Sequence, residues 1–397
     1  MCKNINERKV YMIYLNNAST TKPDKKVIDD FVYCAENYWH NPSDVSNNGL
    51  EAKDIIKTAQ KQIADSINAK PEEIIFTSGG SESNNWAIKG YVDNYNVDLI
   101  LTTEIEHPSV YNTCLFCKEH GTRVIYIPVN GCGVIDLYYL EKTMKFYGNV
   151  RKILVSIMFA NNEIGTIQPI KEISDIVHKY GGVLHVDAVQ AYMHSPIDVQ
   201  DLGIDMMSTS FHKFGGFKNC GFLYIRNGIG LTPLIHGGHQ FDSKRSGTEN
   251  VPMIYAMGNQ VERLNTNLTL SYKYIEEMYN YIIVQIYDKC EIFNKICLNG
   301  EPYNRMYNNL NFTFEGTDAN TLISLLELKG IYVSAGSACC AGTNTPSKVL
   351  KAIGLSDEAA FSTIRISINE NTTKKEIDCF VDALFECIKS IKEFNLD

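Results

Sequence analysis

Two adjacent cysteines lie in a segment whose other residues are all small. Cys339 and Cys340 fall within residues 334–342, where every other position is Ser, Ala or Gly. A buried cysteine usually has large apolar neighbours and is inert, whereas a thiol on a loop of small residues is accessible. The segment therefore predicts a reactive thiol, with a tight turn that carries incidental cysteines as the alternative. An electrophile supplied by the rest of the chain would decide between the two.

A lysine and an aspartate each follow a run of residues that predicts a β-strand. Lys213 lies in Ser-Phe-His-Lys-Phe-Gly-Gly at 210–216, and Asp187 ends the run at 183–187. Open α/β sheets bind ligands at such strand ends. A lysine that forms an imine and a carboxylate that pairs with a pyridinium nitrogen are what pyridoxal phosphate requires. The alternatives are a solvated surface lysine and an N-capping aspartate.

A glycine turn leads from a third predicted strand into a helix. Residues 77–85 read Thr-Ser-Gly-Gly-Ser-Glu-Ser-Asn-Asn and follow the apolar run at 74–76. Free backbone N–H groups and the helix dipole at such a turn hold a phosphate, although a structural turn explains the feature alone equally well. Together with the lysine and the aspartate, the turn predicts pyridoxal phosphate, whose conjugated imine is the electrophile that the thiol needs.

These residues need a scaffold of alternating strands and helices. The sequence predicts strands at 74–76, 99–102, 123–127, 153–157, 183–187, 206–209 and 222–225, with helices such as 170–180 between them. This pattern is typical of a mostly parallel sheet covered by helices. A long helix at 251–287 is predicted to link this α/β domain to a smaller one, which has strands at 309–314 and 363–368 and a terminal helix at 374–394.

Composition excludes several classes of protein. The 397 residues are 44% hydrophobic and carry a formal charge of −9 with scattered Lys and Arg, which opposes binding to nucleic acid. Twelve cysteines are too few for a disulfide scaffold, and no apolar run is long enough to span a membrane. We therefore expect a cytoplasmic protein with free thiols. Cys114-x-x-Cys117 lacks a second such pair, so no metal site is predicted.

The chain resembles the cysteine desulfurases of the fold-type I, class V aminotransferase group over nearly its full length. The motifs that carry the resemblance are Tyr-Leu-Asn-Asn-Ala-Ser-Thr-Thr at 14–21, Asn-Pro-Ser at 41–43, the loop at 78–85, Glu-His at 106–107, Asn-Asn-Glu-Ile-Gly at 161–165, 185–190, 210–213, Arg-Ser-Gly-Thr-Glu-Asn at 245–250, Gly-Ser-Ala-Cys at 336–339 and Thr-Ile-Arg at 363–365. The resemblance implies a large cofactor-binding domain at 14–255 with a mostly parallel seven-stranded sheet. It also implies a small α/β domain at 256–397, on which residues 1–13 would pack.

The resemblance also assigns roles in binding pyridoxal 5′-phosphate. Lys213 would form the imine, Asp187 would pair with the ring nitrogen and His107 would stack on the ring and move protons. Gln190 and Asn162 would contact the ring hydroxyl and nearby substrate groups. The implied phosphate ligands are Gly80, Ser81, Ser210 and His212, with Thr248 reaching the phosphate of the neighbouring subunit in a homodimer.

The implied reaction converts L-cysteine to L-alanine. Arg365 would clamp the substrate carboxylate, which suits its planar guanidinium, and the Cys339 thiolate would attack the substrate sulfur and become a persulfide. A sulfur-acceptor protein, either an iron–sulfur scaffold or a tRNA thiolation enzyme, would follow. The alternatives are a selenocysteine lyase, another class V aminotransferase-like enzyme, and a non-catalytic thiol protein.

The chain departs from the family pattern at a few positions. Ser46 stands where a histidine is common, Phe217 and Asn219 fall in a run that is usually Gly-Pro-Lys-Gly, and Phe241 begins a segment that replaces Glu-x-Gly. None of these changes removes a proposed catalytic group. Cys340 is also unusual beside the nucleophile, and we expect it to have no role.

Overall fold

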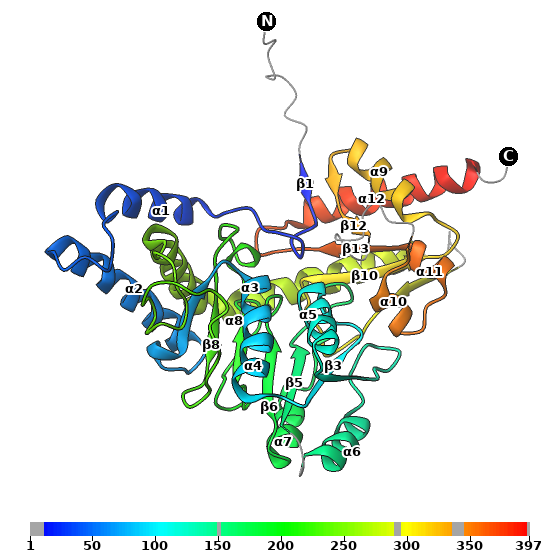
Figure 1. The fold of residues 1–397 in the computed structure, drawn as a ribbon. Helices are drawn as coiled ribbons and strands as arrows, with labels where there is room; N and C mark the ends of the chain where they lie inside the picture. Colours follow the sequence, from blue (N-terminus) through cyan, green and yellow to red (C-terminus); the bar gives the residue numbers. More distant parts are fainter. Residues whose placement is uncertain (1–11, 149–151, 290–294, 336–344, 395–397) are drawn as a thin grey trace, which may run out of the picture.

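The computed structural model describes residues 12–148, 152–289, 295–335 and 345–394. Within them, a seven-stranded sheet of order β2-β8-β7-β6-β5-β3-β4 forms the centre of the larger part (Figure 1). Its strands are β2 (Ile74–Thr77), β3 (Leu99–Thr103), β4 (Arg123–Ile127), β5 (Ile153–Met158), β6 (Val183–Asp187), β7 (Met206–Ser208) and β8 (Gly221–Ile225). In this sheet β8 pairs with β2 and β7 in the antiparallel sense, and all other pairs are parallel. The predicted α/β fold with a mostly parallel seven-stranded sheet is confirmed.

Side chains that alternate in direction along the strands form a hydrophobic core on each face of this sheet. Successive side chains of a strand point to opposite faces, so Ile100 and Leu154 pack on one side while Leu101 and Val155 pack on the other. The first face is covered by α3 (Gly80–Asn85), a π-helical turn (Trp86–Gly90), α4 (Tyr91–Tyr95) and α5 (Pro108–Glu119). The second face is covered by α1 (Lys25–Asn37), α2 (Asn47–Ser66), α6 (Leu137–Tyr147), α7 (Ile170–Lys179) and the first part of α8 (Val251–Asp288).

A second, four-stranded sheet organises the C-terminal part. Its order is β12-β13-β10-β9, with all three pairs antiparallel. The elements of this part are β9 (Ile296–Leu298), β10 (Asn309–Phe314), α9 (Ala319–Leu328), β11 (Ile331–Tyr332), β12 (Ser334–Ala335), α10 (Lys348–Ala352), α11 (Asp357–Phe361), β13 (Thr363–Ser367) and α12 (Lys374–Phe394). A separate hydrophobic cluster joins β10, β13, α9 and α12 to the second half of α8.

Two segments connect the two parts. The helix α8 contributes Ile254 to the core of the large sheet and Ile282 to that of the small one. At the other end of the chain, β1 (Ile13–Tyr14) pairs in parallel with β11, and Ile13 and Leu15 are buried in the C-terminal cluster. The first described residues thus lie on the smaller part, and the chain then crosses to the larger one. The division into domains at 14–255 and 256–397 stays a prediction.

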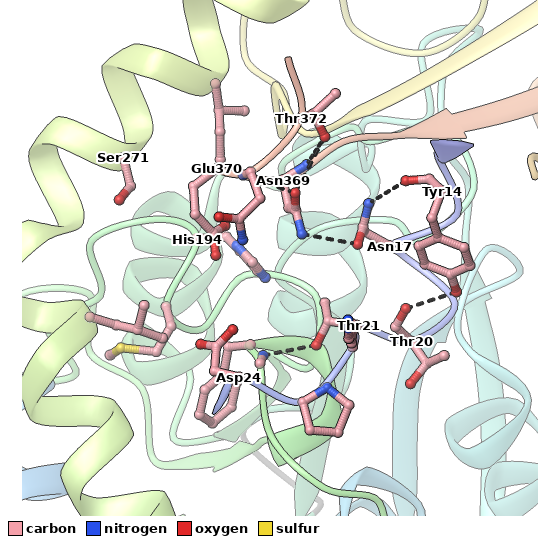
Figure 2. A pocket seen from close by; sticks show the side chains of 18 of the residues that line it. Tyr14, Asn17, Thr20, Thr21, Asp24, His194, Ser271, Asn369, Glu370 and Thr372 are labelled. Carbon is pink, nitrogen blue, oxygen red and sulfur yellow. Dashed lines mark hydrogen bonds between the residues drawn. The ribbon is translucent and has the colours of Figure 1, made fainter. Parts of the chain in front are cut away.

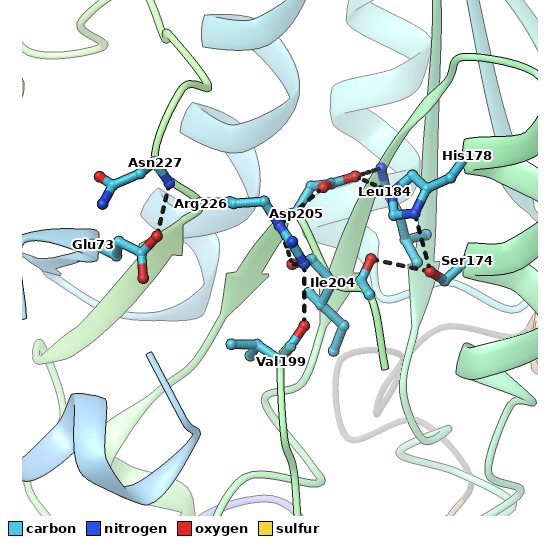
Figure 3. Close-up of polar contacts among 10 residues, drawn as sticks. Glu73, Ser174, His178, Leu184, Val199, Ile204, Asp205, Arg226 and Asn227 are labelled. Atoms are coloured by element: carbon cyan, nitrogen blue, oxygen red, sulfur yellow. Dashed lines mark hydrogen bonds and ion pairs between the residues drawn. The ribbon is translucent and has the colours of Figure 1, made fainter. Parts of the chain in front are cut away.

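A polar cluster closes the end of the sheet opposite to Asp187. Asp205 directly precedes β7, and its Oδ2 lies 2.8 Å from His178 Nε2 and accepts the Leu184 N–H at 2.8 Å (Figure 3). Its Oδ1 lies 3.2 Å from Arg226 Nε, and Arg226 also donates to the carbonyls of Val199 and Ile204. Since Asp205 is nine-tenths buried, these contacts compensate for removing its charge from water.

Membrane and metal features can be stated for the described part of the chain only. No helix there is long and apolar enough to cross a membrane. No group of three or more His, Cys, Asp or Glu residues in that part is arranged to hold a metal ion. Cys114 and Cys117 are buried on α5, where they pack in the core beneath the helix.

Candidate active site

A cavity of about 660 Å³ opens at the carboxyl ends of the parallel strands, between the two sheets. Its walls hold most of the residues that the sequence singled out. The predicted site residues that line it are Gly80, Ser81, His107, Asn162, Asp187, Gln190, Ser210, His212, Lys213 and Arg365. Of the remaining two, Cys339 lies outside the described residues, and Thr248 is exposed and does not line this cavity.

Asp187 is held in one wall by an asparagine from the helix opposite. It ends β6 and is buried, with 5% exposure. Its Oδ2 accepts a 2.7 Å hydrogen bond from Asn84 Nδ2, and its Oδ1 accepts the Val189 N–H at 3.1 Å. Asn84 Nδ2 also lies 2.8 Å from Ser109 Oγ, while its Oδ1 is buried without a hydrogen-bond partner among the described residues. Asp187 is therefore a fixed, desolvated carboxylate that faces the cavity.

Lys213 enters the cavity from the turn after β7. This turn is a short 3₁₀ helix (Phe211–Lys213), and Lys213 Nζ donates hydrogen bonds to the carbonyls of Ala18 at 2.7 Å and Ser19 at 2.8 Å. Gln190 Nε2 donates to the same Ala18 carbonyl at 3.0 Å. The N-terminal segment therefore positions two predicted cofactor ligands that lie about 170 to 195 residues away in sequence.

The glycine turn after β2 brings backbone close to the lysine turn. Gly79 has a φ of 132°, which a side chain rarely adopts, and a Cβ there would lie 3.2 Å from Ser210 Oγ. A Cβ on Gly80 would lie 2.6 Å from a methyl group of Val189. Neither position has room for a side chain, and Gly80 and Ser81 at the start of α3 line the cavity, so the backbone there is close to it. This is the geometry of a phosphate cradle.

An ion pair ties this turn to the segment that carries Thr248. Glu82 Oε2 accepts the Ser78 N–H at 2.6 Å, and Arg245 Nε lies 2.9 Å from Glu82 Oε1. Arg245 opens the Arg-Ser-Gly-Thr-Glu-Asn motif, so the ion pair joins this motif to the glycine turn, and Thr248 within the motif is exposed. One departure from the family pattern shortly precedes this motif: Phe241 has a φ of 47° and packs on Phe76.

The two other departures are accommodated locally. Ser46 caps α2 by accepting the Gly49 N–H at 3.3 Å, as an N-capping serine does. Phe217 packs in a tilted arrangement against Phe31 of α1, with ring centroids 5.4 Å apart, and Asn219 takes a left-handed φ of 60°, which asparagine tolerates better than most residues. These side chains do not line the cavity.

The two histidines of the cavity are neutral near pH 7. Burial lowers the pKa of His107, while Asp187 acts in the opposite direction and Lys213 adds to the decrease. Since His107 Nδ1 accepts the Ser109 N–H at 3.1 Å, the neutral ring carries its proton on Nε2. Burial, together with Lys213 and Lys218, lowers the pKa of His212 to about 4.

Arg365 lies on β13 and reaches across from the small sheet. It is 2% exposed, and its guanidinium donates to the Asn162 carbonyl at 2.8 Å and to Asn16 Oδ1 at 2.9 Å. The Asn161 side chain holds the loop of Asn162 by accepting the N–H groups of Glu163 and Ile164. The cation is thus presented in a fixed orientation, as a carboxylate clamp requires.

Sequence reasoning assigned no individual role to three buried groups around the cavity. These are Asn84 beside Asp187, Glu106 beside His107, and Glu163, whose Oε2 lies 2.5 Å from Ser347 Oγ. The motifs that contain them were recognised, but burial depends on the fold and leaves no local signal in sequence.

A second cavity, of about 690 Å³, lies behind the segment that holds Lys213 (Figure 2). Asn17, Thr20 and Thr21 line it, whereas Ala18 and Ser19 between them face the first cavity. His194 Nε2, on the same wall, lies 2.9 Å from the Lys213 carbonyl oxygen. The segment at 14–21 therefore separates the two cavities and holds the Lys213 amine, while His194 contacts the Lys213 backbone.

The residues of the first cavity fit pyridoxal phosphate. A buried carboxylate, a lysine amine within the cavity and a turn without side chains are the three features that this cofactor needs. The orphaned Asn84 Oδ1 indicates that a further polar group belongs beside Asp187.

Comparisons with known proteins agree with this geometry. The model of the family "Aminotransferase class-V" matches residues 13–380. The cysteine desulfurase IscS of Methanosarcina thermophila is 39% identical over 96% of this chain and 93% of its own length. A NifS-like protein superposes with a TM-score of 0.87 at 33% identity, over 95% of this chain and 99% of its own. SspA in complex with cysteine superposes with a TM-score of 0.79 at 33% identity, over 91% and 100%. The chain therefore belongs to the class V aminotransferase family, within its cysteine desulfurase group.

Proposed function

We propose that this chain is a pyridoxal phosphate-dependent cysteine desulfurase, which converts L-cysteine to L-alanine and keeps the sulfur as a persulfide on Cys339. The observation that carries the proposal is the convergence of Lys213, Asp187 and Arg365, from three separate segments, on one cavity. The cysteine bound by SspA, which covers nearly the whole chain, supports L-cysteine as the substrate.

The cofactor would be held at three points of the cavity. Lys213 would bind it covalently, Asp187 would keep a proton on its ring nitrogen, and the turn at Gly80 with Ser81, Ser210 and His212 would bind its phosphate. When bound, pyridoxal phosphate supplies an electron sink that weakens the bonds to the substrate's α-carbon. Gln190 and Asn162 would contact the ring hydroxyl and nearby substrate groups.

The side chains of the cavity would then orient the substrate and move its protons. Arg365 would bind the substrate carboxylate, and the released amine of Lys213 would remove the proton from the α-carbon. His107 would lie at the ring face, where it is neutral and carries a proton on Nε2 that it can donate. The Cys339 thiolate would attack the substrate sulfur: an S–S bond forms, the C–S bond breaks, and the carbon keeps the electron pair and takes a proton.

A second copy of the chain would complete the site. Thr248 is exposed and does not line the cavity of its own chain, which fits a contact to the phosphate of a partner. Large apolar side chains are exposed around α1 and the start of α2, namely Ile28, Val32, Tyr33, Trp39, Val45 and Leu50. Such a patch is typical of an interface. The persulfide would pass from this homodimer to an iron–sulfur scaffold or a tRNA thiolation enzyme.

The direct test is to supply L-cysteine to the holoenzyme and to measure alanine and sulfide in the presence of a reductant. We expect both products from the wild type and from Cys340→Ser, and neither from Cys339→Ser. Full activity of Cys339→Ser would rule out the proposed route of the sulfur.

A matched pair of lysine variants tests the cofactor link. Lys213→Ala should lose the visible absorbance of the bound cofactor together with the activity. Lys218→Ala, in the same loop but exposed, should keep both. Equal spectra of the two variants would contradict the role of Lys213.

A further inference from the structure

Besides Asp187 and Glu163, a further carboxyl group is buried in the wall of the active-site cavity, next to His107. Glu106 is 6% exposed and lines the cavity. Its Oε1 accepts a 2.7 Å hydrogen bond from Thr103 Oγ1. Its Oε2 is buried and accepts no hydrogen bond of normal geometry from the described residues, although the Met158 N–H lies near enough to favour the charged form. The carboxyl group is thus only half satisfied if it is ionised.

The groups that face Glu106 do not favour its ionised form. Asp187, from the end of β6, is a carboxylate and disfavours a second negative charge. Cys114, from α5, is a buried thiol that Glu106 influences, and burial raises the pKa of this thiol. His107, its neighbour in sequence, has a pKa lowered mainly by burial and is neutral. Burial, reinforced by Asp187 against the weaker effect of Thr103 and Met158, raises the pKa of Glu106 to about 8.

We propose that Glu106 is a positioning residue that stands protonated in the cavity wall, so that it adds no negative charge beside Asp187 when the carboxylate of the substrate enters. This inference rests on the proposed function, because the substrate must bring a carboxylate, and finally an ionised sulfur, into the same cavity. A second carboxylate beside Asp187 would repel both groups. Oε2, which accepts no hydrogen bond of normal geometry from the described residues, is the atom that would carry the proton.

The proposal predicts an effect on substrate binding rather than on the chemical step. As pH rises through the pKa of Glu106, the wall gains a charge, and KM for L-cysteine should rise while kcat changes little. Glu106→Gln has the same shape but cannot ionise. From about pH 7 to about pH 9, we expect KM of the wild type to rise roughly tenfold more than that of Glu106→Gln. The substrate's own thiol titrates in this range, but it does so equally for both enzymes.

Two further variants separate the role of Glu106 from a general change at the cavity. Glu104→Gln removes an exposed carboxylate that lines the same cavity, and it should keep the pH dependence of the wild type. Thr103→Val removes the hydroxyl that stabilises the ionised form, and it should move the rise in KM to higher pH. If Glu106→Gln keeps the full rise of KM with pH, or Thr103→Val leaves its position unchanged, the proposal is wrong.

A readout without turnover tests the protonation state itself. Infrared difference spectra of the wild-type holoenzyme against Glu106→Gln should show the band of a protonated carboxyl near pH 7, which disappears as the pH is raised past about 8. Absence of that band near neutral pH would overturn the proposal even if the enzyme is an active desulfurase. If the band is present but the enzyme does not use L-cysteine, Glu106 is protonated as proposed and the proposed function is wrong.

Discussion

Ser347 Oγ donates a 2.5 Å hydrogen bond to Glu163 Oε2, and this contact ties the start of α10 to the loop that holds Arg365. Ser347 is also the N-cap of α10, since its Oγ accepts the Leu350 N–H at 3.3 Å. Glu163 is almost completely buried, which raises its pKa, while Ser347 and Arg365 favour its charged form. One hydroxyl group therefore serves a helix end and a buried carboxyl at once.

Loss of this hydroxyl should destabilise the protein more than loss of a simple cap. Ser347→Ala leaves Glu163 without its hydrogen-bond donor, so we expect the free energy of unfolding to fall by roughly 2–4 kcal/mol, the sum of an unsatisfied buried group and a lost cap. Ser356→Ala is the matched control, because Ser356 caps α11 by accepting the Ala359 N–H at 3.1 Å on the surface. It should cost about 1 kcal/mol. Equal losses in urea denaturation would show that the contact to Glu163 adds nothing.

Arg365→Lys should impair substrate binding while the fold persists. A lysine keeps the charge but loses the planar fork that holds Asn162, Asn16 and a carboxylate together. We expect KM for L-cysteine to rise roughly 10- to 100-fold, which corresponds to the loss of one hydrogen bond to a charged group. Arg305→Lys is the control, because Arg305 is equally buried but donates to four backbone carbonyls outside the cavity. Arg305→Lys should lower the free energy of unfolding and leave KM unchanged. A similar change of KM in both variants would contradict the role of Arg365 in binding the substrate carboxylate.

Asp205→Asn should affect stability without affecting catalysis. The carboxylate joins His178, Arg226 and the Leu184 N–H at the end of the sheet away from the cavity. We expect a loss of roughly 1.5–3 kcal/mol in the free energy of unfolding, with kcat/KM unchanged. Asp175→Asn breaks an exposed pair with Lys171 and should cost less than about 0.5 kcal/mol in the same assay. A reduced kcat/KM of Asp205→Asn would show that this cluster reaches the active site.

Acid should unfold the protein through its buried neutral histidines. Burial lowers the pKa of His185 from 6.5 to about 3 and that of His212 to about 4. Below pH 6.5 these histidines bind protons in the unfolded chain but stay neutral in the folded one. The stability that they contribute is therefore present above this pH and is lost as the pH falls toward 3. His185→Gln should flatten this decline, whatever its effect on stability near pH 7. His236→Gln, on an exposed loop, should not, and an equal slope for wild type and His185→Gln would contradict the assignment.

The local pattern of the sequence was enough to place many of the elements. The strands at 123–127 and 183–187 and the helix at 374–394 have the predicted ends, because runs of apolar residues and helical spacing are properties of neighbouring residues. Elsewhere the ends moved by a residue or two, as in β7, which ends at Ser208 rather than at residue 209. Strand ends depend on pairing with neighbours, which sequence alone does not show.

The sequence by itself determined the chemistry of the site: a lysine turn, an aspartate at a strand end, a glycine turn and a pair of thiols, all in motifs that a family shares. Only the tertiary structure decided which distant groups hold them, such as the Ala18 and Ser19 carbonyls that position Lys213. It also decided the protonation of Glu106 and His212, because burial and neighbouring charges set a pKa and both arise only when the chain folds.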